Sequence, residues 1–429
     1  MTKSKKRLPH KPSSNLLING DNLTVLKFML DNSLLSRLRL PKKIDVIYID
    51  PPYNVGGNQG YRNIWKGESI EKNDSWAGNH GAFLDFLEPR LTAAKNLLSE
   101  NGVMFVSICD GEYCRLKILM DEIFGESNCL GTIIWDKTSG AYGRHLTVIH
   151  EYILVYAKDS CHADRLVRKK ESADLMIAKA LSFKESKTPY ASAQKQFRLW
   201  VKEGLNSGLI GKSEASYCHL HPQSYMPFEP KDMGAQDNPE KRYREPLIHP
   251  VTELPCSVPP KGWRWSEPTF IKRTSKGKTY NGGNFYVNDN VKYGKDESSI
   301  PRQVYPLTEA RLHALPSVIS IPLNQGKKDL PPNIQFPTPK PVELIKILLR
   351  SFHDKNAVVL DFFCGSGTTA QAVHELNSED KGKRRWILVE EIKKTVKSIV
   401  MPRIKQFDST CNYKFVDMGQ IVKYPNSRG

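Results

Sequence analysis

Short apolar runs alternate with amphipathic stretches along the first third of the chain. The apolar runs predict buried strands, and stretches with apolar positions three or four residues apart predict helices. The strands are expected at 16–18, 44–49, 103–108, 132–135 and 152–156, and the helices at 23–30, 83–98 and 111–124. Pro89 is expected to kink or shorten the helix that contains it. Strands that alternate with helices indicate an α/β fold with a parallel, doubly wound sheet.

The alternation stops near residue 159 and returns near residue 333. The region between is richer in Lys, Pro, Gly, Tyr and Trp, and it predicts an inserted, mixed domain. After it, helices are expected at 341–351, 368–376 and 391–405, and strands at 357–362 and 386–390. Neither α/β block has enough strands to cover its own faces, so we predict one sheet completed across the insert. The predicted domains are a basic disordered arm (1–14), two halves of the α/β domain (15–158 and 333–429) and the insert (159–332).

The charge of the chain indicates its kind of partner. Among 429 residues, Lys and Arg number 63 and Asp and Glu number 46, which gives a formal net charge of +17. Such an excess indicates a polyanion, and we favour nucleic acid over a membrane surface. The sequence has no apolar run long enough to span a bilayer, and its basic, polar N-terminus predicts neither a signal peptide nor an anchor. The eight cysteines form no C-x-x-C pair and are interpreted as reduced thiols, so the expected compartment is the cytoplasm.

The strongest chemical signal follows the strand at 44–49 directly and reads Asp50-Pro51-Pro52-Tyr53. Ligands bind at the carboxyl ends of strands in open α/β sheets, so the tetrapeptide lies where a site is expected. An exocyclic amino group on a base is a poor nucleophile, because its lone pair is delocalised into the ring. The Asp50 carboxylate and the Pro51 carbonyl can each accept an amino hydrogen and free that lone pair.

The prolines and the tyrosine of this tetrapeptide support the interpretation, whereas the loop that follows has two possible roles. The two prolines fix the backbone dihedral φ, and Tyr53 offers a ring on which an extruded base can stack. The loop at 54–63 contains three glycines. It is either a lid that closes over the base or an ordinary surface loop.

A second signal is a Gly-containing turn between the strand at 357–362 and the helix at 368–376. It contains Asp361, Phe363, Cys364, Gly365, Ser366, Gly367 and Thr368. Glycines let the backbone approach a ligand closely, and the helix N-terminus offers N–H groups to a carboxylate. The turn indicates a nucleotide-like cofactor, although dinucleotide enzymes carry similar turns. Glu390 ends the next strand and could take ribose hydroxyls, and Asp21 ends the first strand in the same way.

Basic and aromatic residues interleave at three places in the insert. Arg198 lies between Phe197 and Trp200, Arg264 lies between Trp263 and Trp265, and Lys278 precedes Tyr280. Such mixtures suit phosphate contact and base stacking, and core packing is the alternative for any single Trp. No metal is expected, because the candidate ligands fit no standard zinc spacing. Those candidates are Cys218, His219, His221, His249 and Cys256.

These motifs, in this order, resemble the beta group of amino-methyltransferases that act on DNA. The likeness rests on DPPY at 50–53, on F-x-G-x-G at 363–367, and on the basic domain between them. Other stretches that resemble the group are GDNL at 20–23, HEYILVYAK at 150–158, FPTPKP at 336–341 and KGWRWS at 261–266. The greatest similarity is to modification subunits of type III restriction–modification systems. The chain is shorter than is typical of them, which leaves a solitary methyltransferase open.

The resemblance implies a Rossmann-like S-adenosylmethionine-dependent methyltransferase, circularly permuted, with an inserted target-recognition domain. It implies methylation of the N6 amino group of a flipped adenine in double-stranded DNA, with the target held by residues 50–53. The implied cofactor contacts are Asp21, Phe336, Thr338, Lys340, Asp361, Phe363, Cys364, Gly365, Ser366, Gly367, Thr368 and Glu390. The implied protein partners are a second copy of the chain and a restriction subunit.

Three rival functions stay open. An N4-cytosine DNA methyltransferase has the same fold and chemistry, but such relatives more often carry Ser in place of Asp50. An RNA amino-methyltransferase fits the tetrapeptide, whereas the large insert and the motif order favour DNA. An inert DNA-binding module is the third, and four intact residues argue against it: Asp50, Tyr53, Gly365 and Gly367. A cysteine nucleophile attacking cytosine would need Pro-Cys near a strand end, and the one such dipeptide, Pro255-Cys256, lies in the insert.

Overall fold

The computed structural model describes residues 15–31, 43–53, 80–139, 145–170, 172–236, 242–275, 277–310, 312–410 and 412–419. The predicted arm at 1–14 and the predicted glycine loop at 54–63 therefore lie outside the described residues. The chain divides into two compact units. The first contains Met1–Val167 and Ala314–Gly429, and the second contains Arg168–His313, so the second unit is narrower than the predicted insert of 159–332.

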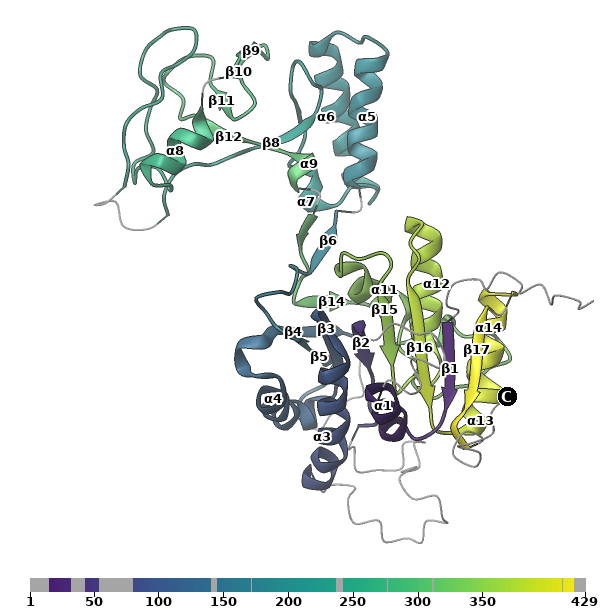
Figure 1. The fold of residues 1–429 in the computed structure, drawn as a ribbon. Coiled ribbons are helices and arrows are strands. Elements are labelled where there is room, and N and C mark those ends of the chain that lie inside the picture. The colour runs from purple at the N-terminus through teal and green to yellow at the C-terminus, as the bar shows by residue number, and fades with distance from the viewer. Residues whose placement is uncertain are drawn as a thin grey trace, which may run out of the picture. The chain divides into compact units, whose positions relative to one another are not determined.

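A nine-stranded sheet forms the centre of the first unit (Figure 1). Its order is β14-β4-β5-β3-β2-β15-β16-β1-β17. The strands in chain order are β1 (Asn15–Asn19), β2 (Ile44–Ile49), β3 (Leu98–Ile108), β4 (Cys129–Asp136), β5 (His150–Ala157), β14 (Val318–Ser320), β15 (Val358–Asp361), β16 (Arg385–Glu390) and β17 (Tyr413–Asp417). Strands from both ends of the chain alternate in this order, which confirms one sheet completed across the insert.

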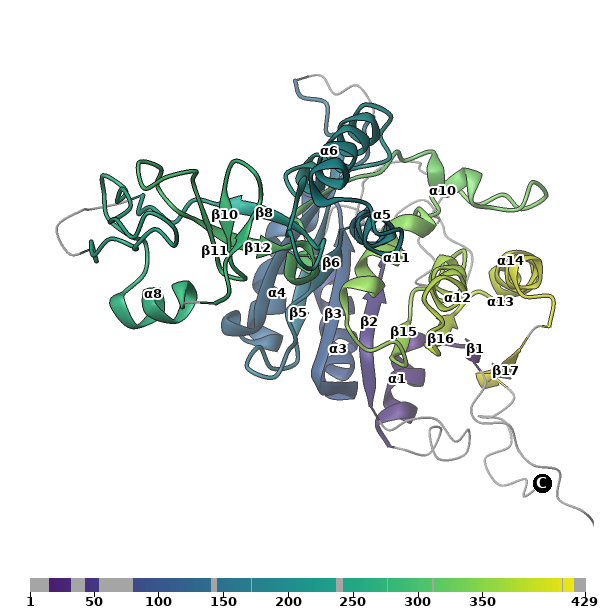
Figure 2. The same cartoon turned by 90° about the horizontal axis from the view of Figure 1, so that it is seen from above.

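Helices cover both faces of this sheet, as a doubly wound fold requires (Figure 2). One face packs against α1 (Asn22–Leu30), α3 (His80–Leu97) and α4 (Asp110–Phe124). The other packs against α11 (Val342–Ser351), α12 (Thr368–Asp380) and α14 (Met401–Phe407). The remaining helical segments of the unit are η1 (Glu126–Asn128), α10 (Gln325–Lys328), α13 (Lys393–Thr395) and a π-helical turn (Val396–Val400).

Alternation within the strands supplies both cores. In β2, Ile47 and Ile49 join the core beneath α1 and α3, whereas Val46 and Tyr48 join the core beneath α11 and α12. Successive side chains of a strand point to opposite faces, so a strand covered on both sides reads as a continuous apolar run. The predicted α/β class is confirmed. The circular permutation stays a prediction, because it is defined against the chain order of other proteins.

One local expectation is wrong and a second is wrong in part, since a kink at Pro89 stays a prediction. The sheet is not wholly parallel, because β5 pairs antiparallel with both β3 and β4. Pro89 does not shorten its helix, because α3 is helical on both sides of it from His80 to Leu97. Among the described helices, none is long and apolar enough to cross a membrane.

The second unit combines a helical layer with a six-stranded antiparallel sheet. The sheet order is β7-β8-β12-β11-β10-β9, from His219–Leu220, Pro227–Lys231, Arg302–Pro306, Val291–Tyr293, Tyr286–Val287 and Tyr280–Asn281. The helices are α5 (Ala173–Glu185), α6 (Tyr190–Asn206), α7 (Lys212–Ala215), α8 (Glu267–Thr274) and α9 (Leu307–Ala310). A two-stranded sheet, β6 (Val167–Lys169) with β13 (Leu312–Ala314), lies where the chain enters and leaves this unit. Trp263 is fully buried against Phe270, so packing explains it.

Candidate active site

The predicted site residues follow neighbouring parallel strands of the first unit. β15 pairs in parallel with β2 on one side and with β16 on the other, and β16 pairs in parallel with β1. Carboxyl ends of parallel neighbours meet at one edge of a sheet. The structure therefore brings Asp50, the turn after Asp361, Glu390 and Asp21 to the same edge.

Asp50 and Tyr53 belong to a hydrogen-bonded network that sequence reasoning did not predict. The Tyr53 hydroxyl lies 2.9 Å from Asp50 Oδ1 and 2.9 Å from Glu151 Oε2. One hydroxyl carries one hydrogen, so Tyr53 can donate to only one of these carboxylates at a time. Glu151 is the second residue of β5.

Lys340 supplies the positive charge at the centre of this network. Its ammonium lies 2.8 Å from Asp50 Oδ1, 3.0 Å from Glu151 Oε2 and 2.9 Å from the Tyr53 hydroxyl. It also lies 4.9 Å from the centre of the Tyr53 ring. Lys137 adds a second cation, 3.3 Å from Glu151 Oε1. The structure thus places Lys340, which the resemblance implies as a cofactor contact, against the target tetrapeptide.

Burial and charge set the ionisation of the network. Burial raises the pKa of Asp50, the Glu151 charge adds to this rise, and Lys340 opposes it. Burial also acts to raise the pKa of Glu151, but Lys340 and Lys137 outweigh it and the pKa is lowered. Burial would lower the pKa of Lys340, yet the two carboxylates hold it above its ordinary value. Lys340 therefore stays charged and favours the ionised form of both acids.

The two contacts to Asp50 use one oxygen of its carboxylate. Tyr53 and Lys340 both reach Oδ1, and the described residues supply no hydrogen bond to Oδ2. The Asp50 side chain is 26% exposed, compared with 9% for Lys340. Among the described residues, Oδ2 is therefore left open to accept a further hydrogen bond.

The Gly-containing turn has the backbone geometry that only glycine adopts readily. Gly365 has φ of +49° and Gly367, which caps α12, has φ of +77°. A Cβ atom at Gly365 would lie 3.2 Å from Cζ of Phe336, so this aromatic ring lies directly against bare backbone. The close approach predicted for the turn is therefore present, next to one of the implied cofactor contacts.

The acidic residues of this edge hold the turn in shape. Glu390 accepts backbone hydrogen bonds from Gly365 (3.1 Å) and Ile392 (3.0 Å), and burial raises its pKa to about 7. Asp361 accepts from the Thr369 hydroxyl (2.5 Å) and the Phe363 N–H (3.1 Å), and burial raises its pKa to about 7 as well. These bonds fix both carboxylates before any ligand binds. The ribose contact implied for Glu390 stays a prediction.

Asp21 caps a helix in this structure. Its carboxylate accepts from the N–H of Thr24 (2.7 Å) in the first turn of α1, and Arg90 lies 3.3 Å from it. Capping of this kind typically stabilises a helix by about 1 kcal/mol. The cap explains the residue without a ligand, so the cofactor contact implied for Asp21 stays a prediction. Thr338 is exposed, and its implied contact also stays a prediction.

A buried arginine supports the far side of the turn and was missed by sequence reasoning. Arg403 of α14 is 1% exposed. Its guanidinium donates to the Ser366 hydroxyl (2.9 Å) and the Thr368 hydroxyl (3.0 Å). Ser366 and Thr368 are themselves buried, so these two predicted contacts lie beneath the turn. Cys364 is buried as well.

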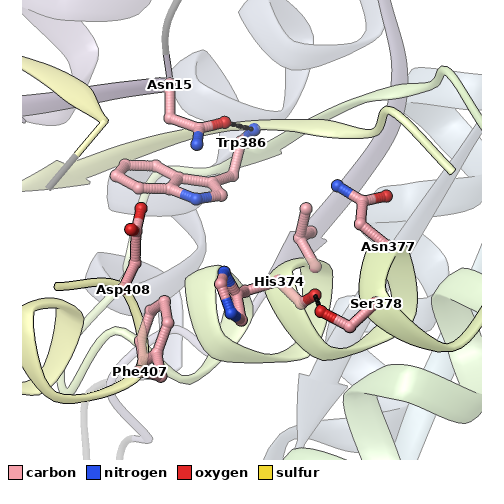
Figure 3. Close-up of a pocket in the computed structure, with 8 residues that line it drawn as sticks. Asn15, His374, Asn377, Ser378, Trp386, Phe407 and Asp408 are labelled. Carbon is pink, nitrogen blue, oxygen red and sulfur yellow. Dashed lines mark hydrogen bonds between the residues drawn. The ribbon is translucent and has the colours of Figure 1, made fainter. Parts of the chain in front are cut away.

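A hollow of about 210 Å³ lies at the amino ends of the strands, opposite the candidate site (Figure 3). Asn15 and Trp386, at the amino ends of β1 and β16, line it together with residues of α12 and α14. Its amide side chains are occupied: Asn15 accepts from the Trp386 N–H, and Asn377 exchanges hydrogen bonds with the Arg384 backbone. The hollow is therefore explained by local packing.

Two histidines of the second unit, His221 and His249, form backbone contacts. The ring Nδ1 atoms of His221 and His249 accept N–H groups from the residues that follow them. Within the described part of the chain, no group of three or more His, Cys, Asp or Glu side chains could hold a metal ion.

Comparison with known proteins identifies the family. The family model for DNA methylases (N6_N4_Mtase) matches residues 44–401, which include both the tetrapeptide and the Gly turn. The chain belongs to the DNA methylase family. Among DNA methylases, the type III restriction–modification enzyme EcoP15I Mod subunit of Escherichia coli is 32% identical over 89% of this chain and 59% of its own length. The type II methyltransferase M.KpnI of Klebsiella pneumoniae is 30% identical over 91% of this chain and 84% of its own.

The methylase described here is similar to only part of some relatives. It spans 59% of the EcoP15I Mod subunit and 52% of the StyLTI Mod subunit of Salmonella typhimurium. The match to M.KpnI extends over most of both chains. Family membership therefore rests on the family match over residues 44–401 and on relatives that align with most of this chain, whereas the activity of the longer relatives is not transferred by it.

Proposed function

We propose that this DNA methylase is site-specific and transfers a methyl group from S-adenosylmethionine to the N6 amino group of a flipped adenine. The observation that carries the proposal is the placement of Asp50 beside the Gly turn, at the ends of the neighbouring parallel strands β2 and β15. Membership of the DNA methylase family supports it. Asp50, Pro51, Pro52 and Tyr53 bind the target, and the second unit, Arg168–His313, reads the sequence.

The residues around the Gly turn fit the proposed cofactor. S-adenosylmethionine supplies a methyl group bound to a positively charged sulfur. Burial is the main cause of the raised pKa of Asp361. The nearby negative charges of Asp50 and Glu390 raise it further, so the three carboxylates lie close together. Such an acidic edge favours a cation. Phe336, Gly365 and Glu390 would hold the cofactor, with the remaining predicted residues of the turn beneath them.

The chain's own groups activate the target nitrogen. Asp50 Oδ2 and the Pro51 carbonyl accept the two amino hydrogens, which draws electron density back onto nitrogen as it attacks the methyl group. Lys340 keeps Asp50 ionised throughout. The Tyr53 ring stacks on the base, which lowers the cost of taking it out of the duplex. The nitrogen takes the methyl group as the bond from that group to sulfur breaks, and it then loses its extra proton; no covalent bond between the enzyme and the base is needed.

The proposal extends to partners. The net charge of +17 supports double-stranded DNA as the substrate. A second copy of the chain and a restriction subunit are the protein partners we propose, the latter because two relatives carry Mod subunit names. An N4-cytosine product is the second candidate, and Asp at position 50 favours adenine over it.

The product tests the proposal directly. DNA incubated with the protein and S-adenosylmethionine is expected to yield N6-methyladenine, measured by mass spectrometry of the digested nucleosides. N4-methylcytosine in its place would overturn the base assignment. The absence of both cofactor binding by calorimetry and any methylated nucleoside would support the inert DNA-binding module instead.

Gly367→Leu is expected to abolish binding of S-adenosylmethionine. A side chain at this position would meet Val400 Cγ1 at 3.2 Å and would push the turn towards the ligand. The left-handed backbone adds about 1–2 kcal/mol of strain. Gly208→Leu is the matched control, because Gly208 has the same φ of +77° but open space around its Cβ position. Calorimetry measures affinity and thermal unfolding measures stability. A folded Gly367→Leu variant with unchanged affinity would remove the turn from the cofactor site.

A further inference from the structure

Three basic side chains converge within the second unit. Lys292 of β11 and Arg302 of β12 are direct cross-strand partners in the six-stranded sheet. Like charges opposite one another destabilise a sheet. Folding alone therefore gives no reason to place these two cations together.

Arg198 joins them from α6. One helical turn earlier, Gln194 donates to the Cys218 carbonyl (2.9 Å) and accepts from the Leu220 N–H (2.7 Å), which fixes α6 against β7. His219 lies between these two backbone contacts. Residues four apart share one face of a helix, so Arg198 lies on the same side as Gln194, towards β7.

The neighbouring groups respond to the three charges together. Burial lowers the pKa of His219 to about 4, and Arg198, Lys292 and Arg302 add to the effect. Burial lowers the pKa of Lys292, and Arg302 and Arg198 lower it further. The three cations are thus close enough to repel one another, and His219 stays neutral among them.

No carboxylate of the described residues lies within ion-pair distance of these three side chains. This contrasts with the neighbouring Lys231, which lies 3.7 Å from Glu229. The ring of Phe285 lies 4.6 Å from the Lys292 ammonium and supports it from one side. Three positive side chains that lie together without a nearby carboxylate of the described residues are suited to bind an anion from outside the chain.

We propose that Arg198, Lys292 and Arg302 form a phosphate-binding site that takes a phosphodiester of the DNA backbone. The inference rests on the proposed function, because it presupposes a DNA substrate. One guanidinium group can donate two parallel hydrogen bonds to two oxygens of a phosphate, and a lysine ammonium adds a compact positive charge. Backbone contacts position a protein on the duplex without reading its sequence, so this site orients the second unit and other residues select the bases.

The test compares charge-removing variants by the salt dependence of DNA binding. The variants are Arg198→Gln, Lys292→Gln and Arg302→Gln. Each is expected to weaken DNA binding by the same factor whether or not the duplex contains the target sequence. The slope of log affinity against log salt should become shallower by about 0.9 for each phosphate that the variant no longer neutralises. Thermal unfolding should show equal or higher stability, because removing one charge relieves repulsion in the cluster.

Lys231→Gln is the matched control. Lys231 is the register partner of Gln303, the neighbour of Arg302, so it lies on the other face of the same sheet. The control removes the same charge, and its salt slope is expected to equal that of the parent. Equal slopes in the parent and the three cluster variants, or an equally shallow slope in Lys231→Gln, would overturn the inference.

Two further measurements are needed. One distinguishes a DNA phosphate from a small anion, and the other distinguishes failure of this inference from failure of the proposed function. Binding of inorganic phosphate that depends on Arg302, together with unchanged DNA affinity, would assign the cluster to a small anion and overturn the inference. A parent protein that binds DNA with cluster dependence but never methylates it would overturn the proposed function alone. A parent that methylates DNA while the variants bind normally would overturn this inference alone.

Discussion

Asp50→Ala is expected to lose methyl transfer while still binding S-adenosylmethionine. Asp50 follows β2, whereas the Gly turn and Glu390 follow β15 and β16, so the substitution removes the amino-group acceptor and leaves the proposed cofactor residues in place. Removing one group that stabilises a transition state typically costs about 10²–10³-fold in rate. Single-turnover transfer of a labelled methyl group to DNA measures the rate, and calorimetry measures the cofactor affinity.

Asp45→Ala provides the control for this variant. Asp45 lies on the same strand, where its carboxylate accepts the Val358 N–H (2.8 Å) at the opposite end from the site. This control should lower stability through the β2–β15 pair while leaving the chemical step intact in the folded protein. Full activity in Asp50→Ala would contradict the mechanism, whatever the product proves to be.

Lys340→Met is expected to lower methyl transfer most strongly at acidic pH. The substitution removes the cation 2.8 Å from Asp50, so the pKa of Asp50 rises further under the influence of burial and Glu151. Protonation removes the negative charge that makes Asp50 a strong acceptor of amino hydrogens, so activity is lost as pH falls through this raised pKa. The acidic limb of the pH–rate profile should therefore move to higher pH. Below the pKa, each unit of rise costs about tenfold in the ionised fraction.

Two comparisons make the Lys340→Met result specific. Lys346→Met also removes a buried lysine that pairs with carboxylates, Glu343 of α11 and Glu375 of α12, but neither belongs to the Asp50 network, so its profile should not move. Lys340→Arg keeps the charge and should keep the acidic limb near its original pH. A loss confined to cofactor affinity, with an unmoved profile, would instead support the cofactor contact that the resemblance implied for Lys340.

Much of the first unit could be predicted because its signals are local. The strands β1, β2 and β15 and the 103–108 part of β3 are buried on both faces, so each appears in the sequence as a largely apolar run. The tetrapeptide and the Gly turn follow two of these strands directly, and their spacing is visible in a single chain. Pairing of the two distant blocks followed from their strand counts, since neither could cover its own faces.

The direction of β5 could not be predicted in this way. Because β5 was expected to be parallel, Glu151 was not recognised as a candidate site residue. Alternating strands and helices suggested a parallel sheet, but no helix separates β4 from β5 among the described residues, and the two pair antiparallel. A reversed strand begins where its parallel neighbours end. Glu151 therefore lies near the start of β5 and still reaches Tyr53 at 2.9 Å. The stretch that contains Glu151, HEYILVYAK at 150–158, could have pointed to this residue only through its resemblance to the family.

The order of the nine-stranded sheet has a consequence for synthesis on the ribosome. β2 and β15 are neighbours, yet the hydrogen bond from Val358 to Asp45 joins positions 313 residues apart. Contacts between distant residues form slowly, because the loop between them must close first. The first half of the sheet must wait, with the β2 edge unpaired, while the whole second unit is made. An unpaired edge is prone to aggregate. The part of the sheet that carries the candidate site is therefore completed only after β15 and β16 have been made.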